Sequence, residues 1–376
     1  MKIRLITRHF IVNYGSFLQT YATCNFFEEL GYPVEVIDYI PSSEETFRVI
    51  KEYLKGNSRW NKNIFSRIIY LILKYPGEKI AFLNFRKIQK HSLVLSKKLK
   101  SVDEIEVYIE NKGKCIYCAG SDQLWGPMPS GTYDDAYFLK FEREYPKISF
   151  SSSIGRSVNF DEKVINLLKQ FAFISCRENS AKKYLEGFLG LPMKTILDPT
   201  LLVDRDIWLK RINGITKKDF NKKYILFYQL HPESNLDVIR EYYIKNGFNI
   251  INISPSFGVL GKKGVSKYVS DPFLFLAYIN HAEAIVTDSF HGTCFSLLLE
   301  KEFYSYVPEK TGTRIKELLD NLNLEERAFN TNSLVPEIIS ERKIDYLYVN
   351  NILQEKRSED IEWFTKQLRK VIKNNE

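Results

Sequence analysis

Short apolar runs and amphipathic stretches alternate along most of this 376-residue chain. In the first forty residues, a strand-like run at 2–7 precedes a polar loop, an amphipathic helical stretch that ends at Gly31, and a second strand-like run at 34–39. The same alternation continues from 114 to 199 and from 222 to 323. Because helices that join parallel strands cover both faces of the sheet, this pattern predicts an α/β protein with doubly wound parallel sheets.

The chain is longer than one ordinary hydrophobic core requires, which predicts two domains. The strand–helix series restarts after Pro199, so we expect Rossmann-like domains at 1–203 and 204–376. Between about 44 and 110 the sequence is rich in lysine, helix-forming and without a clear motif, and we expect a helical insertion over the first domain. Ser358 is the expected N-cap of a final helix.

With 44% hydrophobic and 27% charged residues, the composition is that of a globular protein. The net charge of +8 is spread along the chain, with short basic clusters at 96–100 and 216–223. Charge distributed in this way favours an anionic small ligand or an anionic membrane surface over a dedicated nucleic-acid groove. The aromatic content of 14% fits sugar-stacking surfaces, but the bias of an AT-rich bacterial genome is the simpler explanation.

The most apolar window, 63–85, contains Arg67 and Lys74 and is interrupted at Pro76-Gly77. It is too short and too charged to span a bilayer. An amphipathic helix resting on a membrane or on the domain stays open, and a helix packed on the domain is the expectation. The N-terminal run lacks the apolar core of a signal peptide, which together with an odd number of cysteines predicts a cytoplasmic protein.

Cys115 and Cys118 form a single C-x-x-C within a strand-like run, and no second pair follows. We expect small core residues here instead of a metal or redox site. Clustered histidines, Asp/Glu-rich ligand sets, a Walker loop, a G-x-G-x-x-G after a strand and a G-x-S-x-G elbow are all missing from the sequence. The sequence therefore predicts no metal site.

Ligands of doubly wound sheets bind at the carboxyl ends of the strands, so polar turns at those ends are candidate sites. The first such turn contains Asn13, Tyr14 and Gly15 and opens a helix. The free backbone amides of a helix N-terminus suit a phosphate or a sugar hydroxyl. The alternative is a tight turn that simply needs a glycine.

The second turn, at 119–126, offers Ser121, Asp122, Gln123 and Trp125. Asp122 has the chemistry of a general base or of a group that orients a hydroxyl, and its structural alternative is a cap of the next turn. Trp125 has a ring that can stack on a sugar face.

The third turn places Arg177 just after a buried strand, where a cation needs an anion nearby. That anion is either a protein carboxylate such as Glu178 or the carboxylate or phosphate of a ligand. The fourth turn, at 287–293, contains His291, which can transfer a proton near pH 7 at the start of a helix. A single histidine can equally be a satisfied structural residue. Lys310 and Arg314 follow the next strand.

Seven segments, taken in order, resemble the polysaccharide pyruvyl transferase family. They are "NYGSFLQTYAT", "GSDQLWG", "KISFSSSIG", "SCREN", "LDPTLLVDRDIW", "TDSFHGTCFSLLLEKEF" and "TRIKELLDNLNLEER". The resemblance covers roughly residues 1–330 and leaves 45–100 unmatched. It implies a GT-B-like arrangement of the two domains around an interdomain cleft, with the acceptor on the N-terminal domain, the donor on the C-terminal domain, and the final helix packed back on the N-terminal domain.

The resemblance also implies an activity. Members of this family move a pyruvyl group from phosphoenolpyruvate onto two sugar hydroxyls as a ketal, without a cofactor or a metal. The acceptor is a sugar of a bacterial surface polysaccharide or of its lipid-linked oligosaccharide precursor, which brings the enzyme into peripheral contact with the inner membrane. By similarity, His291 is the general acid, with Asp122 as its catalytic partner facing the acceptor.

The expected binding residues fall into two sets, of which the resemblance itself assigns Arg177 and Lys310 to the donor and the Asn13-Tyr14-Gly15 loop to the acceptor, while the others come from the turns described above. The donor set is Arg177, Ser289, Gly292, Lys310 and Arg314. The acceptor set is Asn13, Tyr14, Gly15, Ser121, Gln123 and Trp125. Many family members carry an arginine where this chain has Ser289, so either Arg314 supplies the missing cation or the donor differs.

Two other functions stay open at this point. A GT-B-type glycosyltransferase that uses a nucleotide sugar would share the fold, with Glu309 as a candidate to hold the ribose. A non-catalytic carbohydrate-binding protein would tolerate the loss of His291 and of the cations in the cleft.

Overall fold

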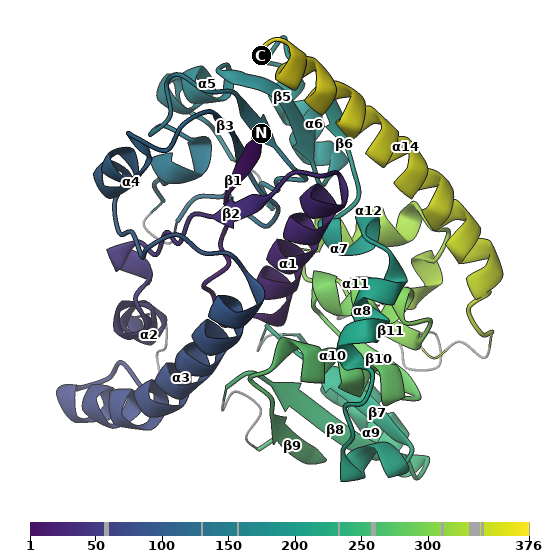
Figure 1. The fold of residues 1–376 in the computed structure, drawn as a ribbon. Helices are drawn as coiled ribbons and strands as arrows, with labels where there is room; N and C mark the ends of the chain where they lie inside the picture. Colours follow the sequence, from purple (N-terminus) through teal and green to yellow (C-terminus); the bar gives the residue numbers. More distant parts are fainter. Residues whose placement is uncertain are drawn as a thin grey trace.

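The computed structural model describes residues 1–55, 60–128, 131–155, 158–231, 234–256, 261–309, 312–330, 339 and 342–375. Within these ranges the chain forms two six-stranded sheets, and all the paired strands run parallel. Helices flank both sheets (Figure 1). The predicted pair of doubly wound α/β domains is therefore confirmed.

The N-terminal sheet has the strand order β2-β1-β3-β4-β5-β6. Its strands are β1 (Lys2–Ile6), β2 (Val34–Val36), β3 (Cys115–Ala119), β4 (Lys147–Ser149), β5 (Phe171–Cys176) and β6 (Met193–Thr195). Chain order reverses between β1 and β3, so polar turns after these two strands lie at the switch point where ligands bind. Every residue of β3 is buried, as expected for a strand covered on both faces.

The C-terminal sheet has the order β12-β11-β10-β7-β8-β9, with its switch point between β7 and β10. Its strands are β7 (Tyr224–Tyr228), β8 (Asn249–Ser254), β9 (Val265–Tyr268), β10 (Ala284–Thr287), β11 (Glu302–Tyr306) and β12 (Ala328–Phe329). The two edge strands, β9 and β12, were not expected. β9 has no buried residue and β12 has two residues, so neither carries the apolar run that marks a strand in sequence.

The helices fall largely where the periodicity places them. They are α1 (Tyr14–Glu29), α2 (Thr46–Lys55), α3 (Ile64–Ser92), α4 (Val102–Ile109), α5 (Glu162–Leu168), α6 (Asn179–Glu186), α7 (Pro199–Leu202), α8 (Arg205–Ile212), α9 (Asp237–Lys245), α10 (Pro272–His281), α11 (Phe290–Leu298), α12 (Thr313–Asp320) and α14 (Tyr346–Lys373). Short 3-10 turns occupy Ser42–Glu44, Asp135–Phe138, Lys218–Asn221 and Glu325–Arg327.

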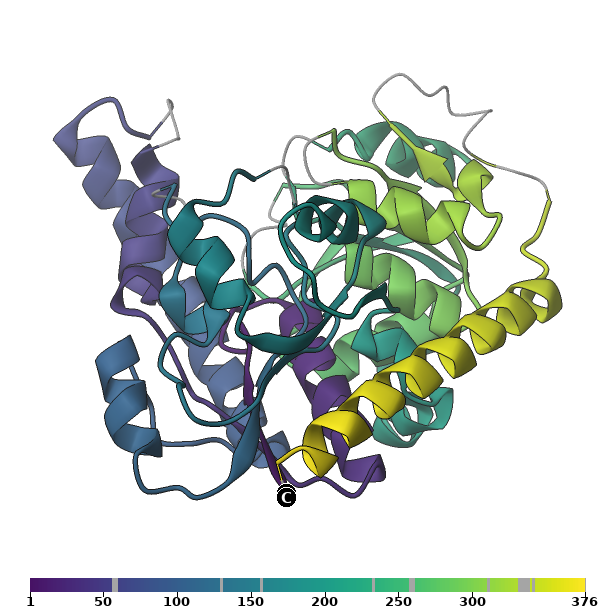
Figure 2. The ribbon, with the colours of Figure 1, turned by 90° about the horizontal axis from the view of Figure 1, so that it is seen from above.

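The insertion forms a helical hairpin of α2 and α3, which projects from the N-terminal domain (Figure 2). The expected interruption at Pro76-Gly77 is wrong, because α3 continues through Pro76 as one helix of 29 residues. A proline removes only one helical hydrogen bond, and the turns on either side keep theirs. The expectation that this helix is packed on the domain holds only for its C-terminal half, where its fully buried residues from Gly77 to Gln89 lie.

The final helix begins at Tyr346, twelve residues before the expected start. Asp345 caps it by accepting a hydrogen bond from the backbone N–H of Tyr348. The predicted cap, Ser358, lies inside the helix, where its hydroxyl donates to the carbonyl of Gln354. The prediction missed the first half of α14 because that half is largely exposed and its apolar period is weak.

α14 leaves the C-terminal domain and runs along the N-terminal one (Figure 1). Phe364 lies at the centre of this contact, with its ring 4.7 Å from Phe150 and 5.3 Å from Phe173 between centroids. Asp360 accepts the backbone N–H of Leu197 and pairs with a lysine of β6. The last helix therefore completes the core of the first domain.

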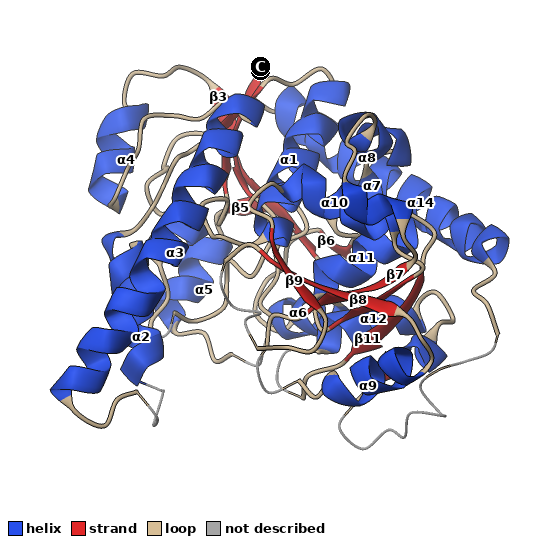
Figure 3. Cartoon of the chain, turned by 90° about the horizontal axis from the view of Figure 1, so that it is seen from below, coloured by secondary structure: helices blue, strands red, loops and turns tan. Residues whose placement is uncertain are grey.

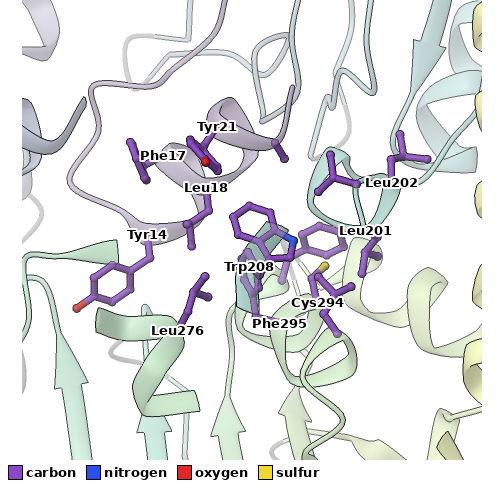
Figure 4. Packing of buried hydrophobic residues seen from close by; sticks show 14 of the residues in the cluster. Tyr14, Phe17, Leu18, Tyr21, Leu201, Leu202, Trp208, Leu276, Cys294 and Phe295 are labelled. Atoms are coloured by element: carbon purple, nitrogen blue, oxygen red, sulfur yellow. The ribbon is translucent and has the colours of Figure 1, made fainter. Parts of the chain in front are cut away.

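Helix α1 connects the two domains through a shared apolar core (Figure 4). Tyr14 stacks on Phe275 of α10, with the ring centroids 4.1 Å apart, and donates a hydrogen bond to the carbonyl of Val269. Trp208 of α8 is fully buried between Tyr21 and Phe295. Where α1 lies, the boundary between the two domains is thus filled by packed side chains.

The five cysteines are buried and none forms a disulfide. Cys115 and Cys118 both belong to β3 and are buried, which confirms the expected core role. Within the described ranges, no helix has both the length and the apolar character that crossing a membrane requires.

Candidate active site at the domain boundary

The first turn of α11 meets the first turn of α1 across the domain boundary. Ser289 follows β10 and is the N-cap of α11, accepting the backbone N–H of Gly292 at 3.2 Å. His291 therefore projects from the start of a helix, and its side chain is nearly buried, with 9% exposed. A Cβ atom on Gly15 would lie 2.1 Å from Nδ1 of His291, so only glycine fits opposite this ring.

Arg177 follows β5 of the N-terminal domain and is also nearly buried. Its Nη2 pairs with Oδ2 of Asp198 at 3.0 Å and contacts the hydroxyl of Ser121. Among the described residues, neither Nε nor Nη1 of Arg177 has a hydrogen-bond partner, although both atoms are buried. A buried guanidinium with two unpaired nitrogens is costly unless an anion meets it.

Glu178, the predicted structural partner of Arg177, is engaged elsewhere. Its Oε1 accepts the hydroxyl of Ser153 and the backbone N–H groups of Ile154 and Gly155 at 2.8–3.0 Å. The carboxylate that pairs with Arg177 is instead Asp198, which comes from the turn after β6.

Asp198 connects Arg177 to His291. Its Oδ1 caps α7 by accepting the backbone N–H and the hydroxyl of Thr200, while Oδ2 lies 3.4 Å from Nε2 of His291. Burial raises the pKa of this carboxyl, but the charges of Arg177 and His291 outweigh burial and hold the pKa well below its usual range. Asp198 is therefore ionised at neutral pH and faces both groups.

Sequence reasoning missed Asp198 as a site residue. Its position before Pro199, at the start of a helix, is the pattern of an ordinary N-cap, and Asp198 does act as one. A cap occupies one carboxylate oxygen. The role of the other oxygen depends on the neighbours that the fold brings to it.

Arg314, in the first turns of α12, brings a second guanidinium to the same place. Its Cζ lies 5.3 Å from the ring centroid of Phe290, and Cζ of Arg177 lies 5.2 Å from the same ring. Burial and the neighbouring charge of Arg177 lower the pKa of Arg314. Nε of Arg314 is buried and, within the described part of the chain, unpaired. Two cations held this close favour a bound anion.

Asp122 lies on the α1 side of the cluster, in a left-handed conformation with φ of 88°. Its Oδ2 accepts the hydroxyl of Ser16 at 2.7 Å, and its Oδ1 accepts the backbone N–H of Gln123 at 2.8 Å. Burial raises the pKa of Asp122, but Arg177 and His291 outweigh burial and lower it. A carboxylate with a lowered pKa is a weak base near pH 7, so this geometry suits orientation of a hydroxyl better than general base catalysis.

A family model for polysaccharide pyruvyl transferases matches residues 13–309, most of the chain. The chain belongs to the polysaccharide pyruvyl transferase family. The match spans Gly15, Asp122, Arg177, Asp198 and His291 and ends before Arg314. The family membership inferred from the seven sequence segments is thus confirmed.

Solved structures of similar shape are distant in sequence. Anabaena Alr3699/HepE in complex with UDP and glucose has a TM-score of 0.51 and 8% identity, with all of both chains covered. The spinosyn forosaminyltransferase SpnP has a TM-score of 0.50 and 9% identity, with 98% of this chain and 99% of the other covered. A trehalose-6-phosphate synthase has a TM-score of 0.50, 8% identity and 98% and 99% coverage. These likenesses show the fold alone and confirm the GT-B-like arrangement. No curated protein sequence matches the chain significantly.

The family's predicted donor set comes from both domains in this structure. Arg177 belongs to the N-terminal domain, and Arg314 and His291 belong to the C-terminal one. Ser289 and Gly292 have structural roles here: Ser289 caps α11, and a Cβ on Gly292 would lie 2.6 Å from Oγ1 of Thr287. The predicted donor ligand Lys310 lies outside the described residues.

Three residues of the predicted acceptor set are fully buried in this structure. Tyr14 is fully buried in the core between the domains. Trp125 is fully buried, and its indole N–H donates to the carbonyl of Tyr137, so its ring packs in the core of the domain here. Ser121 is fully buried, and its hydroxyl is engaged with Arg177, with the carbonyl of Ser151 and with Asp198.

The other acceptor candidates lie at the rim of the cluster. Asn13 is half-buried and caps α1 by accepting the backbone N–H groups of Gly15 and Ser16. Gln123 is half-buried and lies over Gly155, whose φ of 75° and close contact with this side chain both require glycine. In the part of the chain that the structure describes, no three His, Cys, Asp or Glu side chains converge as metal ligands.

Proposed function

We propose that this family member transfers the pyruvyl group of phosphoenolpyruvate to two hydroxyls of a sugar and releases phosphate. The observation that carries the proposal is the pair of guanidinium groups beside His291, with unpaired N–H groups on Arg177 and on Arg314. The expected acceptor is a sugar of a bacterial surface polysaccharide or of its lipid-linked precursor.

The donor fits the charge of the cluster. Phosphoenolpyruvate carries a phosphate and a carboxylate, and Arg177 and Arg314 offer N–H groups that can grip each of them. The first turn of α11 adds the positive end of a helix dipole. Arg314 supplies the second cation that many family members have at the position of Ser289, so phosphoenolpyruvate remains the best donor for this chain.

His291 is the proposed proton donor. As one sugar hydroxyl oxygen bonds to C2 of the enolpyruvyl group, the proton of His291 passes to C3, which becomes the methyl group. The second hydroxyl of the sugar then bonds to C2 while the bond from C2 to the phosphate oxygen breaks. The hydroxyl protons return to His291 and to the departing phosphate, so atoms and charge balance.

Asp198 and Asp122 assist without bonding to the reacting carbon. Asp198 lies beside Nε2 of His291, where it can orient the ring and compensate its charge when the ring is protonated. Asp122 lies in the turn after β3, where its carboxylate contacts Ser16 of α1 and can also accept a hydrogen bond from the attacking hydroxyl.

A nucleotide-sugar glycosyltransferase is the second candidate. It is favoured by the likeness of the fold to a structure that holds UDP and glucose, and by cations that would also suit a diphosphate. Glu309, the candidate ribose ligand, is exposed in the loop after β11. An acidic residue in that loop is compatible with either donor, so the ligands themselves must decide.

A thermal-shift titration distinguishes the two candidates. Phosphoenolpyruvate and a panel of nucleotide sugars are titrated against wild type, Arg177→Ala and the matched control Arg143→Ala, whose side chain is exposed. A donor at about 100 times its Kd stabilises the fold by about 2.7 kcal/mol. We expect a shift with phosphoenolpyruvate that Arg177→Ala loses and the control keeps. A shift with nucleotide sugars alone would overturn the proposal.

A further inference from the structure

The N-terminal half of α3 presents a continuous apolar face to solvent. At about 100° per residue, six large side chains between 64 and 73 fall on one half of the helix surface. They are Ile64, Phe65, Ile68, Ile69, Ile72 and Leu73, each between 48% and 75% exposed. Ile80 and Leu83 continue the same face toward the domain and are also exposed. A contiguous apolar face of this kind marks an interaction surface.

This face is distinct from the one that holds the hairpin together. Helix α2 buries Ile50 and Leu54, and the far half of α3 buries Ala81 and Phe85. The hairpin projects away from both sheets, with α2 and the first half of α3 at its tip (Figures 2 and 3). The exposed isoleucines and leucines of α3 are therefore additional to the core of the protein.

The same segment carries the positive charge of the chain. Residues 46–100 contain fourteen Lys or Arg and two Glu, a net charge of +12, whereas the whole chain has +8. The remaining residues together carry −4. Arg48, Lys51 and Lys55 of α2 and Lys87 and Lys90 of α3 are all exposed. The expectation that the net charge is spread along the chain is therefore wrong, because the net positive charge is concentrated in one stretch, most of which forms the hairpin.

The hairpin is continuous with the candidate active site. In the far half of α3, Phe85 stacks on Tyr14 with 6.0 Å between ring centroids, and Asn84 donates a hydrogen bond to the hydroxyl of Ser270 in the C-terminal domain. Tyr14 immediately precedes Gly15, on which the ring of His291 rests. The exposed face at 64–73 therefore belongs to the same helix that packs at the domain boundary, about 17–30 Å further along its axis.

We propose that the α2–α3 hairpin docks the N-terminal domain onto an anionic lipid bilayer. The apolar face of α3 enters the interface between headgroups and acyl chains, and the surrounding lysines and arginines pair with anionic headgroups. A second copy of the chain is a poorer occupant, because bringing two segments of net charge +12 together costs electrostatic energy. The docking itself does not depend on which donor the active site uses.

Docking of this kind holds the domain boundary within about 17–30 Å of the inserted face, the length of α3 between 64–73 and Phe85. A lipid-linked acceptor could then reach His291 with its lipid still in the bilayer, a consequence that rests on the proposed pyruvyl transfer. The membrane measurement below needs neither the donor nor the acceptor. Its failure is therefore distinguishable from a failure of the proposed function.

The test is co-sedimentation of the full-length protein with vesicles of phosphatidylcholine, with or without about 30% phosphatidylglycerol. We expect binding to the anionic vesicles, weakened at about 0.5 M salt. Phe65→Ser/Ile69→Ser/Leu73→Ser should lower the partition coefficient about tenfold or more, because it removes the inserted side chains. Lys62→Gln/Lys87→Gln/Lys90→Gln should lower it by a similar factor.

Two matched controls keep the result specific. Val107→Ser/Val238→Ser/Leu347→Ser removes exposed apolar side chains elsewhere, and Lys169→Gln/Lys183→Gln/Lys373→Gln removes exposed charges elsewhere. Both should bind vesicles like wild type. Equal sedimentation of wild type and the α3 triple variant would overturn the proposal, as would binding that ignores lipid charge. The proposal would also be overturned if wild type formed an oligomer without binding vesicles and the α3 triple variant were monomeric. The apolar face would then be a contact between copies of the chain.

Discussion

His291 lies directly against the backbone of Gly15, and the two residues come from different domains. The approach is so close that a Cβ atom on residue 15 would overlap the side chain of His291. It would lie 2.1, 2.4 and 2.8 Å from Nδ1, Cγ and Cβ of that residue. The first turn of α1 therefore sets the position of the candidate proton donor. A glycine that sequence alone explains as a turn residue is in fact part of the active-site geometry.

Gly15→Ala tests this relationship. The added methyl group must displace the ring of His291, so we expect kcat for phosphate release from phosphoenolpyruvate to fall by about 10²–10⁴, the usual contribution of a general acid. The preference of a helix for alanine over glycine, about 1 kcal/mol, offsets only part of the strain of displacing a nearly buried side chain, so we expect a modest fall in the melting temperature and a kcat measured on folded enzyme. Gly190→Ala, at an open surface position, is the control for adding a methyl group. A Gly15→Ala enzyme with wild-type kcat would show that the ring position does not matter.

Asp198→Asn should destabilise the protein at neutral pH. The change leaves Arg177 and His291 without their buried counter-charge, a situation that costs about 3–5 kcal/mol. Denaturant unfolding at pH 7 measures the effect, with Asp206→Asn, an exposed carboxylate of α8, as the control. Equal stability of Asp198→Asn and wild type would mean that the ion pair contributes nothing.

The pH dependence of the same pair of proteins has a defined sign. The folded-state pKa of Asp198 lies below its unfolded value of about 3.9. Its contribution is therefore fully present above pH ~4 and is lost as the pH falls below that value. The stability difference between wild type and Asp198→Asn should be constant from pH 5 to 7 and should narrow below pH ~4. A difference that instead narrows as the pH rises toward 7 would contradict this assignment.

Arg314→Gln should weaken the donor site without unfolding the protein. Loss of a hydrogen bond to a charged group costs about 1.5–3 kcal/mol, which corresponds to a Kd for phosphoenolpyruvate that is about 10 to 150 times higher. Because the change also relieves the repulsion that lowers the pKa of Arg314, the melting temperature without donor should stay level or rise. Titration calorimetry measures the affinity, and Lys316→Gln on the same helix is the control. An unchanged affinity for phosphoenolpyruvate would mean that a residue other than Arg314 provides the second cation of the donor site.

The strand–helix alternation was enough to predict both sheets, because each internal strand is an apolar run that the helices bury. It was not enough to orient side chains at the strand ends. Ser121 and Asp122 are neighbours, yet the first is buried against Arg177 and the second faces Ser16 of α1. Trp125 follows within the same turn but points into the core. Sequence places such residues at the right edge of the sheet, whereas their directions depend on the local backbone, here a φ of 88° at Asp122.

The residues missed and misjudged share a second cause, which is contact between distant parts of the chain. Asp198 meets His291 only because the two domains pack together, and no spacing in the sequence relates them. The apolar face of α3 was expected to pack on the domain, because an apolar period indicates that a helix has a covered face but not what covers it. These features follow from tertiary structure, so a local pattern could not predict them.

The path of α14 has a consequence for the order in which the protein is made. The N-terminal domain is synthesised first, but Phe364, which completes its core beside Phe150 and Phe173, follows the strands of the second domain in the chain and is translated after them. Domains usually fold as units in the order of their synthesis. Here the first domain must wait with an apolar surface uncovered until the second has been translated. The nascent chain is therefore a natural client for chaperones, and a premature stop before residue 346 should yield an aggregation-prone fragment instead of a shorter folded protein.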